Sequence, residues 1–139
     1  MTSDSAERVI YNRNDASSKV TVALYAVEDA VNAIENTISA LRQYITDAQE
    51  SNRERFQIIT SGKAGITRND IVVEAMLFHG YIENEYYPLL HDIGLFATFL
   101  YDKPIIDKKI HKKLVVERKH LLKLIQETRY HENQLDALL

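Results

Sequence analysis

The chain of 139 residues has no cysteine and no tryptophan, and only two prolines and four glycines. Without cysteine, disulfides, thiolate metal sites and thiol catalysis are excluded. The few glycines and prolines favour long helices with few connections over a fold of many short strands. The apolar runs are far shorter than the roughly 18–20 residues of a membrane span, and no signal peptide is visible. We therefore expect a cytoplasmic protein with no membrane partner.

What the sequence does contain is typical of one soluble domain. Apolar residues make up 45% of the chain and charged residues 27%, which is too apolar for a disordered tail. Residues 1–14 are mostly polar and are predicted to form a flexible N-terminal arm. Residues 15–139 are predicted to form a single helical bundle domain.

The clearest pattern is an uncharged apolar repeat over residues 20–48. Its members are spaced alternately four and three residues apart, which is a coiled-coil repeat of about 3.5 residues. They are Val20, Leu24, Val27, Val31, Ile34, Ile38, Leu41, Ile45 and Ala48. This partner seam predicts a homo-oligomer or a helical protein partner. A helix over 15–61 would be about 70 Å long, so we expect either a break near Ser51–Asn52 or an elongated molecule.

Two further helices follow the first. Thr67 and Asp70 have the spacing of a capping box and predict where the second helix begins. Its apolar stripe contains Pro88, which predicts a kink near Tyr86–Tyr87 or a break. The third helix is expected from about Ile105 to Tyr130 or beyond. The predicted fold is all-α: an elongated antiparallel helical bundle of three long helices, the middle one kinked or broken at Pro88.

Four polar residues stand at helical spacing on or beside the apolar stripes. Glu117 falls at the centre of the stripe of the third helix, with His120 three residues later. A carboxylate at such a position must be paired, protonated or metal-bound. His79 and Glu83 are four residues apart on the second helix. Either set is explained by ordinary pairing with a neighbouring helix, or alternatively all four bind iron or zinc.

The stretch from Phe78 to Leu90, FHGYIENEYYPLL, resembles the His-x-x-x-Glu helix of hemerythrin-like domains. The segment Glu117–Leu122 is similar to the last ligand helix of that family. This resemblance implies a four-helix bundle that holds two non-heme irons. Where the family carries a histidine on its first helix, this chain has Tyr25 and Val27.

Charge is distributed unevenly along the chain. Residues 1–101 carry eight Lys/Arg against fourteen Asp/Glu, whereas residues 102–139 carry nine against six. Four lysines fall on one face of the third helix, opposite its apolar stripe: Lys108, Lys112, Lys119 and Lys123. Such a face follows a phosphate backbone or meets an acidic helix. Because Glu28, Asp29 and Glu35 lie on the first helix and the chain is net acidic, we favour the acidic helix, in the same or a neighbouring copy, over nucleic acid.

No spacing in the sequence indicates a nucleophile with its base, and no glycine-rich phosphate loop is present. The sequence therefore predicts a non-enzymatic helical protein, without a cofactor, that acts through self-association or helix-mediated partner binding. The alternatives are a hemerythrin-like metal-binding bundle and a small nucleic-acid-binding subunit that uses the lysine face.

Overall fold

The computed structural model describes residues 31–101 and 108–139, and over these ranges the chain is helical without strands. The elements are α3 (Val31–Ile59), α4 (Arg68–Tyr81), η2 (Ile82–Tyr86), α5 (Tyr87–Tyr101) and α6 (Lys108–Ala137). The prediction of an all-α fold is confirmed. The predicted N-terminal arm and the expected first residues of the third helix, Ile105–Asp107, lie outside the described residues.

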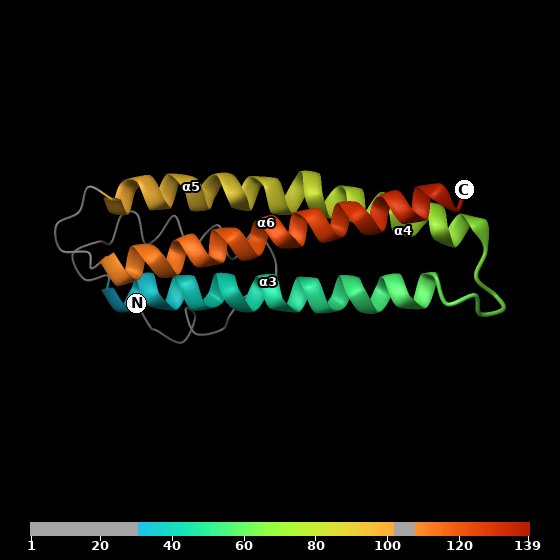
Figure 1. Cartoon of the computed structure of the whole chain (residues 1–139), viewed down its shortest axis with the longest axis horizontal. Coiled ribbons are helices and arrows are strands. Elements are labelled where there is room, and N and C mark those ends of the chain that lie inside the picture. Colours follow the sequence, from blue (N-terminus) through green and yellow to red (C-terminus); the bar gives the residue numbers. More distant parts are fainter. Residues whose placement is uncertain (1–30, 102–107) are drawn as a thin grey trace.

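Three helical rods pack against one another (Figure 1). One is α3, the second is the continuous run of α4, η2 and α5, and the third is α6. Figure 1 shows α3 and α6 running in the same direction and the middle rod running the opposite way. α6 contacts each of the other described elements, so it lies at the centre of the packing.

The described half of the predicted partner seam lies in this chain's own core. Ile34, Ile38, Leu41 and Ile45 are each at most 4% exposed and pack with buried residues of the other two rods. These four side chains therefore already have intramolecular partners. Val20, Leu24 and Val27 lie outside the described residues, so the coiled-coil geometry over 20–48 stays a prediction.

The expected break near Ser51–Asn52 is not present, because α3 continues without interruption from Val31 to Ile59. Asn52 does not end the buried stripe. It is only 4% exposed and finds hydrogen-bond partners inside the molecule.

The connection between α3 and α4 follows the sequence signals closely. Gly62 and Gly65 have φ angles of 73° and 97°, a left-handed backbone that glycine adopts without strain. Thr67 then caps α4: its hydroxyl accepts from the Asp70 amide at 3.2 Å, and the Asp70 carboxylate accepts from the Thr67 amide at 2.8 Å. The predicted capping box is confirmed.

Pro88 produces a local widening of the helix rather than a break. The preceding residues Ile82–Tyr86 form a π-helical segment, and the Tyr87 amide donates to the Ile82 carbonyl five residues earlier. A proline clashes with the carbonyl four residues before it and has no N–H to donate. The wider turn relieves that crowding, and the rod continues as α5. The irregularity thus occupies the turn before Pro88 and ends at Tyr86, where the kink was expected.

In the described part of the chain, no helix combines the length and apolar character that crossing a membrane requires.

Candidate functional site

The most distinctive polar feature is a buried cluster that joins all three rods. Asn52 on α3 donates to the Tyr86 hydroxyl of η2 at 2.8 Å and to the Thr128 hydroxyl of α6 at 3.2 Å. Thr128 in turn donates to the Leu124 carbonyl at 2.7 Å. Burial raises the pKa of the Tyr86 phenol far above its ordinary value, partly opposed by the Asn52 hydrogen bond. The phenol is therefore neutral at physiological pH.

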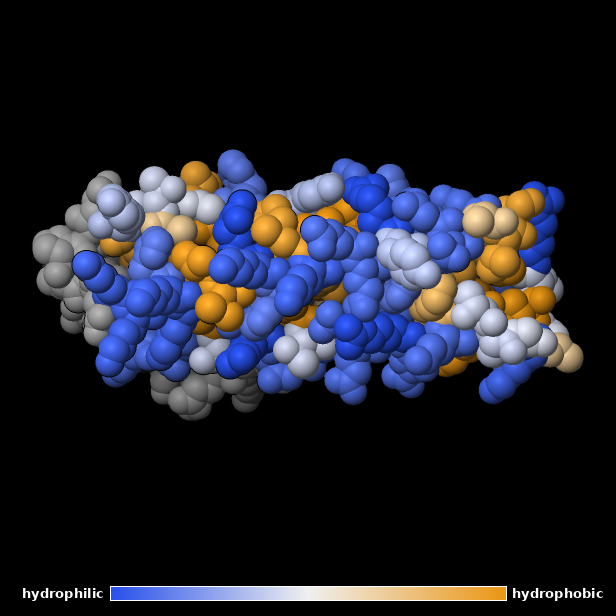
Figure 2. All heavy atoms as spheres, in the orientation of Figure 1, coloured by the Kyte–Doolittle hydropathy of each residue, from blue (hydrophilic) through white to orange (hydrophobic). Residues whose placement is uncertain are grey.

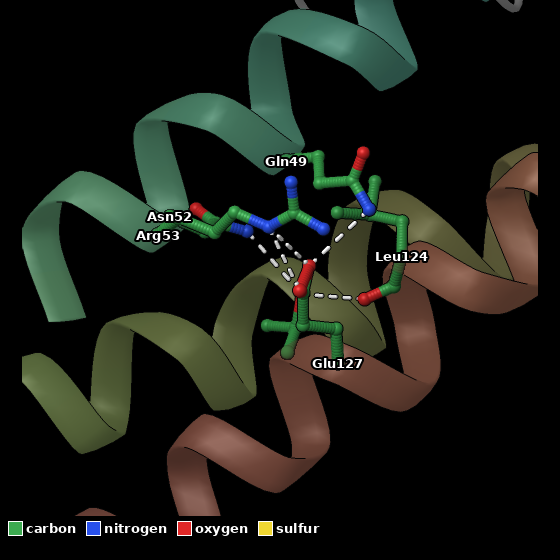
Figure 3. Close-up of polar contacts among 6 residues, drawn as sticks. Gln49, Asn52, Arg53, Leu124 and Glu127 are labelled. Atoms are coloured by element: carbon green, nitrogen blue, oxygen red, sulfur yellow. Dashed lines mark hydrogen bonds and ion pairs between the residues drawn. The ribbon is translucent and has the colours of Figure 1, made fainter.

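An exposed ion pair extends this cluster towards solvent (Figure 3). The Arg53 Nε donates to both Glu127 carboxylate oxygens at 2.9 Å, and the Gln49 side chain donates to one of them at 3.2 Å. Figure 3 shows Gln49, Asn52 and Arg53 reaching from α3 towards α6. A shift of α3 along α6 by one helical turn would break all of these contacts. The arrangement therefore fixes the register of the two helices.

A cavity of about 290 Å³ opens beside the cluster, between α3 and η2. Its walls include Tyr44, Tyr81 and Glu85, and the Tyr44 hydroxyl donates to Glu85 at 3.0 Å. Arg55, also in the wall, donates to Glu74 at 2.8 and 3.1 Å and to the Tyr81 hydroxyl. The hydrogen bond to Glu74 raises the pKa of Arg55 above its usual value. These contacts tie α3 to the middle rod.

Glu117 is buried as predicted, at 3% exposure, near the middle of α6. One carboxylate oxygen lies 3.1 Å from the His120 Nδ1, and the other lies 3.9 Å from the Arg42 Nε of α3. The expected proximity of Glu117 and His120 is confirmed. Its surroundings are those of a paired carboxylate between two helices.

The other two predicted ligands, His79 on α4 and Glu83 on η2, pair with a different part of α6. The His79 Nδ1 is 3.0 Å from Glu132, and Glu83 is 3.7 Å from Arg129. Because Glu132 follows His120 by twelve residues on the same helix, the two positions are about 18 Å apart at 1.5 Å per residue. The prediction that His79, Glu83, Glu117 and His120 converge on one metal is therefore wrong. Within residues 31–101 and 108–139, no group of three or more His, Asp or Glu side chains is arranged to hold a metal ion.

His131 is a buried polar residue that the sequence patterns had not singled out. Its ring stacks on Phe56, with centroids 4.2 Å apart and an angle of 11° between the planes. Its Nδ1 has no hydrogen-bond partner in the described structure. Burial lowers the pKa of His131, and the charge of Arg53 adds to this, while Glu127 acts in the opposite direction. Its position four residues before Leu135 and seven after Leu124 continues the apolar stripe and would have revealed it.

The lowered pKa of His131 predicts a loss of stability in acid. The unfolded chain binds this proton at about pH 6.5, whereas the folded chain binds it only at lower pH. Stability should therefore fall as the pH drops from that value through the folded pKa. His131→Phe keeps the stacking on Phe56 but cannot titrate. Urea unfolding at several pH values should show that the free energy of unfolding falls less in acid for this variant than for the wild type. An equal fall in both proteins would contradict a role of His131 in the acid sensitivity.

The four predicted lysines of the basic face, Lys108, Lys112, Lys119 and Lys123, are all exposed on α6. In the described part of the chain none of them is ion-paired. The lysine that does meet α3 is Lys113, whose Nζ lies 3.0 Å from Glu35. Since the four lysines project from the side of α6 opposite its buried stripe, they do not meet α3 of the same copy. Glu28 and Asp29 lie outside the described residues.

Apolar side chains are also left exposed at the end of the molecule where α4 begins and α6 finishes. Figure 2 shows apolar residues at this end, and further apolar patches between the hydrophilic residues over the rest of the face. On α4, Val73, Met76 and Leu77 are exposed and share one side of the helix, and Met76 is 67% exposed. We call these three residues the α4 outer face. Ile58, near the last residue of α3, is also exposed at this end of the molecule, and so are Leu138 and Leu139, which follow α6.

No protein-family model, curated protein or solved structure matches this chain. The hemerythrin-like resemblance thus has only the quoted residues behind it, and its predicted ligands do not come together.

Proposed function

We propose that this protein is a non-enzymatic helical protein that acts by associating with copies of itself or with another helical protein. The observation that carries the proposal is the α4 outer face. Val73, Met76 and Leu77 follow the i, i+3, i+4 spacing of one helix side, so their side chains adjoin one another. Single exposed apolar residues are ordinary, but adjoining ones on a helix are typical of an interaction surface.

The opposite side of α4 also carries apolar side chains, and these are buried, so the exposed residues are additional to the side that faces the core. Ala75 and Phe78 are buried and pack with Leu135 of α6. α4 is therefore apolar on two sides, of which only one is buried among the described residues. A helix that is apolar on two sides is more stable when both sides are covered, so we expect a helix of another molecule on the outer side of α4. Methionine suits such a contact because its flexible thioether adapts to different neighbours.

The proposal includes the finer architecture predicted from the sequence: an elongated antiparallel bundle with coiled-coil packing along residues 20–48. It differs from the sequence prediction in the surface used. Ile34, Ile38, Leu41 and Ile45 already form the core, so the α4 outer face takes over the partner role from the described half of the seam.

Replacing Met76 with glutamate tests the proposal. A carboxylate at this exposed position leaves the core intact but opposes burial against a partner. The variant should keep the wild-type helicity and melting temperature while its association constant falls about tenfold or more, which corresponds to roughly 1.4 kcal/mol. Gln57→Glu, an exposed change on α3 with the same gain of charge, serves as the matched control. Sedimentation velocity over a concentration series measures both, and unchanged association of Met76→Glu would contradict the role of this face.

A further inference from the structure

The outward side of α6 has charge of one sign over sixteen residues. Lys108, Lys112, Lys119 and Lys123 fall within about 60° of one another at 3.6 residues per turn. We call these four residues the α6 basic face. They include two lysine pairs four residues apart, and like charges at that spacing repel. Within the described chain no carboxylate forms an ion pair with these lysines.

The outward side of α3 has the opposite sign. Asp47, Glu50 and Glu54 also fall within about 60° of one another on their helix. We call them the α3 acidic face. Glu50 and Glu54 are exposed, and Asp47 is half-buried with its carboxylate accepting from Gln43 at 2.9 Å. No lysine or arginine in the described ranges forms an ion pair with any of the three.

The two faces cannot neutralise each other within one copy. α3 turns another side to α6, as shown by Lys113 with Glu35, Arg42 with Glu117 and Arg53 with Glu127. The acidic face points away from those contacts, and the basic face points away from the core. Among residues 31–101 and 108–139, neither face has an ion-pair partner, so each can accept a second molecule.

We infer that the α6 basic face of one copy docks on the α3 acidic face of a second copy. The spacings agree: Glu50 and Glu54 are four residues apart, as are Lys119 and Lys123, and Asp47 and Glu54 are seven apart, as are Lys112 and Lys119. Because the two faces differ, one contact uses the α6 basic face of one copy and the α3 acidic face of the other. Each copy then keeps its second face free for a further copy. Such head-to-tail contacts build an open row of copies or a closed ring.

This inference rests on the proposed self-association and adds to it the surface that sets partner choice. Paired charges at an interface raise the association rate and fix register more than they raise affinity. We therefore expect the α4 outer face to supply the apolar contact and the charged faces to supply orientation. The association should weaken as salt is raised, because exposed charges are screened over about 10 Å at 0.1 M ionic strength.

A charge-swap experiment tests the inference on the full chain. One variant combines Lys119→Glu with Lys123→Glu, and the other combines Glu50→Lys with Glu54→Lys. Each variant alone brings like charges together, so its association constant should fall about tenfold or more. Mixing the two variants restores opposite charges at every contact, and the mixture should recover the wild-type mass distribution in sedimentation velocity. Lys63→Glu, an exposed reversal on the α3–α4 loop, should associate like the wild type.

The other outcomes are each decisive. If both double variants associate like the wild type while Met76→Glu does not, the charge docking is wrong and the proposed function stands. If the wild type is monomeric at low salt, self-association fails and the charge docking fails with it, and only association with another helical protein is left of the proposed function. If the wild type binds a single-stranded oligonucleotide at physiological salt and the lysine variant loses that binding without a change of mass, the basic face serves nucleic acid instead. Failure of the mixture to recover also overturns the inference.

Discussion

Replacing Ile34 with aspartate should prevent folding rather than release a folded monomer. Ile34 is 0% exposed and lies in the main core cluster with residues of all three rods. A carboxylate there is buried without a partner, which costs several kcal/mol out of a total stability of about 5–15 kcal/mol. Circular dichroism should show a chain that has lost most of its helicity, or a melting temperature lowered by tens of degrees.

The matched control is Asn36→Asp, an exposed change two residues further along α3. It adds the same charge to the same helix and should leave the melting temperature within a few degrees of the wild type. If Ile34→Asp instead gives a stable monomer from a wild-type oligomer, then these residues join copies. That result would reverse the assignment of the described seam to the intramolecular core.

The second large effect is expected at the buried cluster of Asn52, Tyr86 and Thr128. Asn52→Leu removes the amide that donates to the Tyr86 hydroxyl and leaves that buried oxygen without this donor. Leaving a buried polar group unpaired costs about 1–3 kcal/mol. Tyr86→Phe leaves Asn52 with Thr128 as its partner and should cost less. Both values can be read from urea unfolding curves.

The combination of Asn52→Leu, Tyr86→Phe and Thr128→Val is the informative variant. It replaces all three polar groups by apolar ones of similar volume, so no buried hydroxyl or amide remains unpaired. Its stability should return to within about 1 kcal/mol of the wild type, because the cost lies in leaving one partner behind. Losses that simply add over the three positions would show that the cluster is not a unit.

Several features of the fold follow from short-range chemistry and were predictable. Thr67 with Asp70 marks the beginning of α4, because the amide of each residue donates to the side chain of the other. Glu117 was placed at the buried centre of α6 by the 3.6-residue period, and its proximity to His120 follows from their spacing on a helix. These inferences need no knowledge of the other helices.

Features that depend on a neighbouring helix were harder to predict. The heptad repeat shows that Ile34 and Ile38 are buried but not whether the cover comes from the same chain. Asn52 ends the apolar pattern, and only the positions of Tyr86 and Thr128 explain why it is tolerated. His79 pairs with Glu132, fifty-three residues away, which no spacing within one helix indicates.

The effect of Pro88 on its helix could also be predicted only in part. Its missing N–H and its ring predict a disturbance in the preceding turn, and the disturbance is present. Whether the helix breaks, kinks or widens depends on the packing that holds both halves in line. Here the buried residues Ile82, Tyr86 and Leu89 keep the rod continuous, so a π-helical segment is the outcome.

The solution mass of the untagged protein tests self-association most directly. Sedimentation equilibrium, followed from below micromolar to tens of micromolar at low salt, should give an average mass that rises above the 16.0 kDa of one chain. Added salt should lower this mass. A mass that stays at 16.0 kDa at every concentration would contradict the claim that this protein acts through self-association.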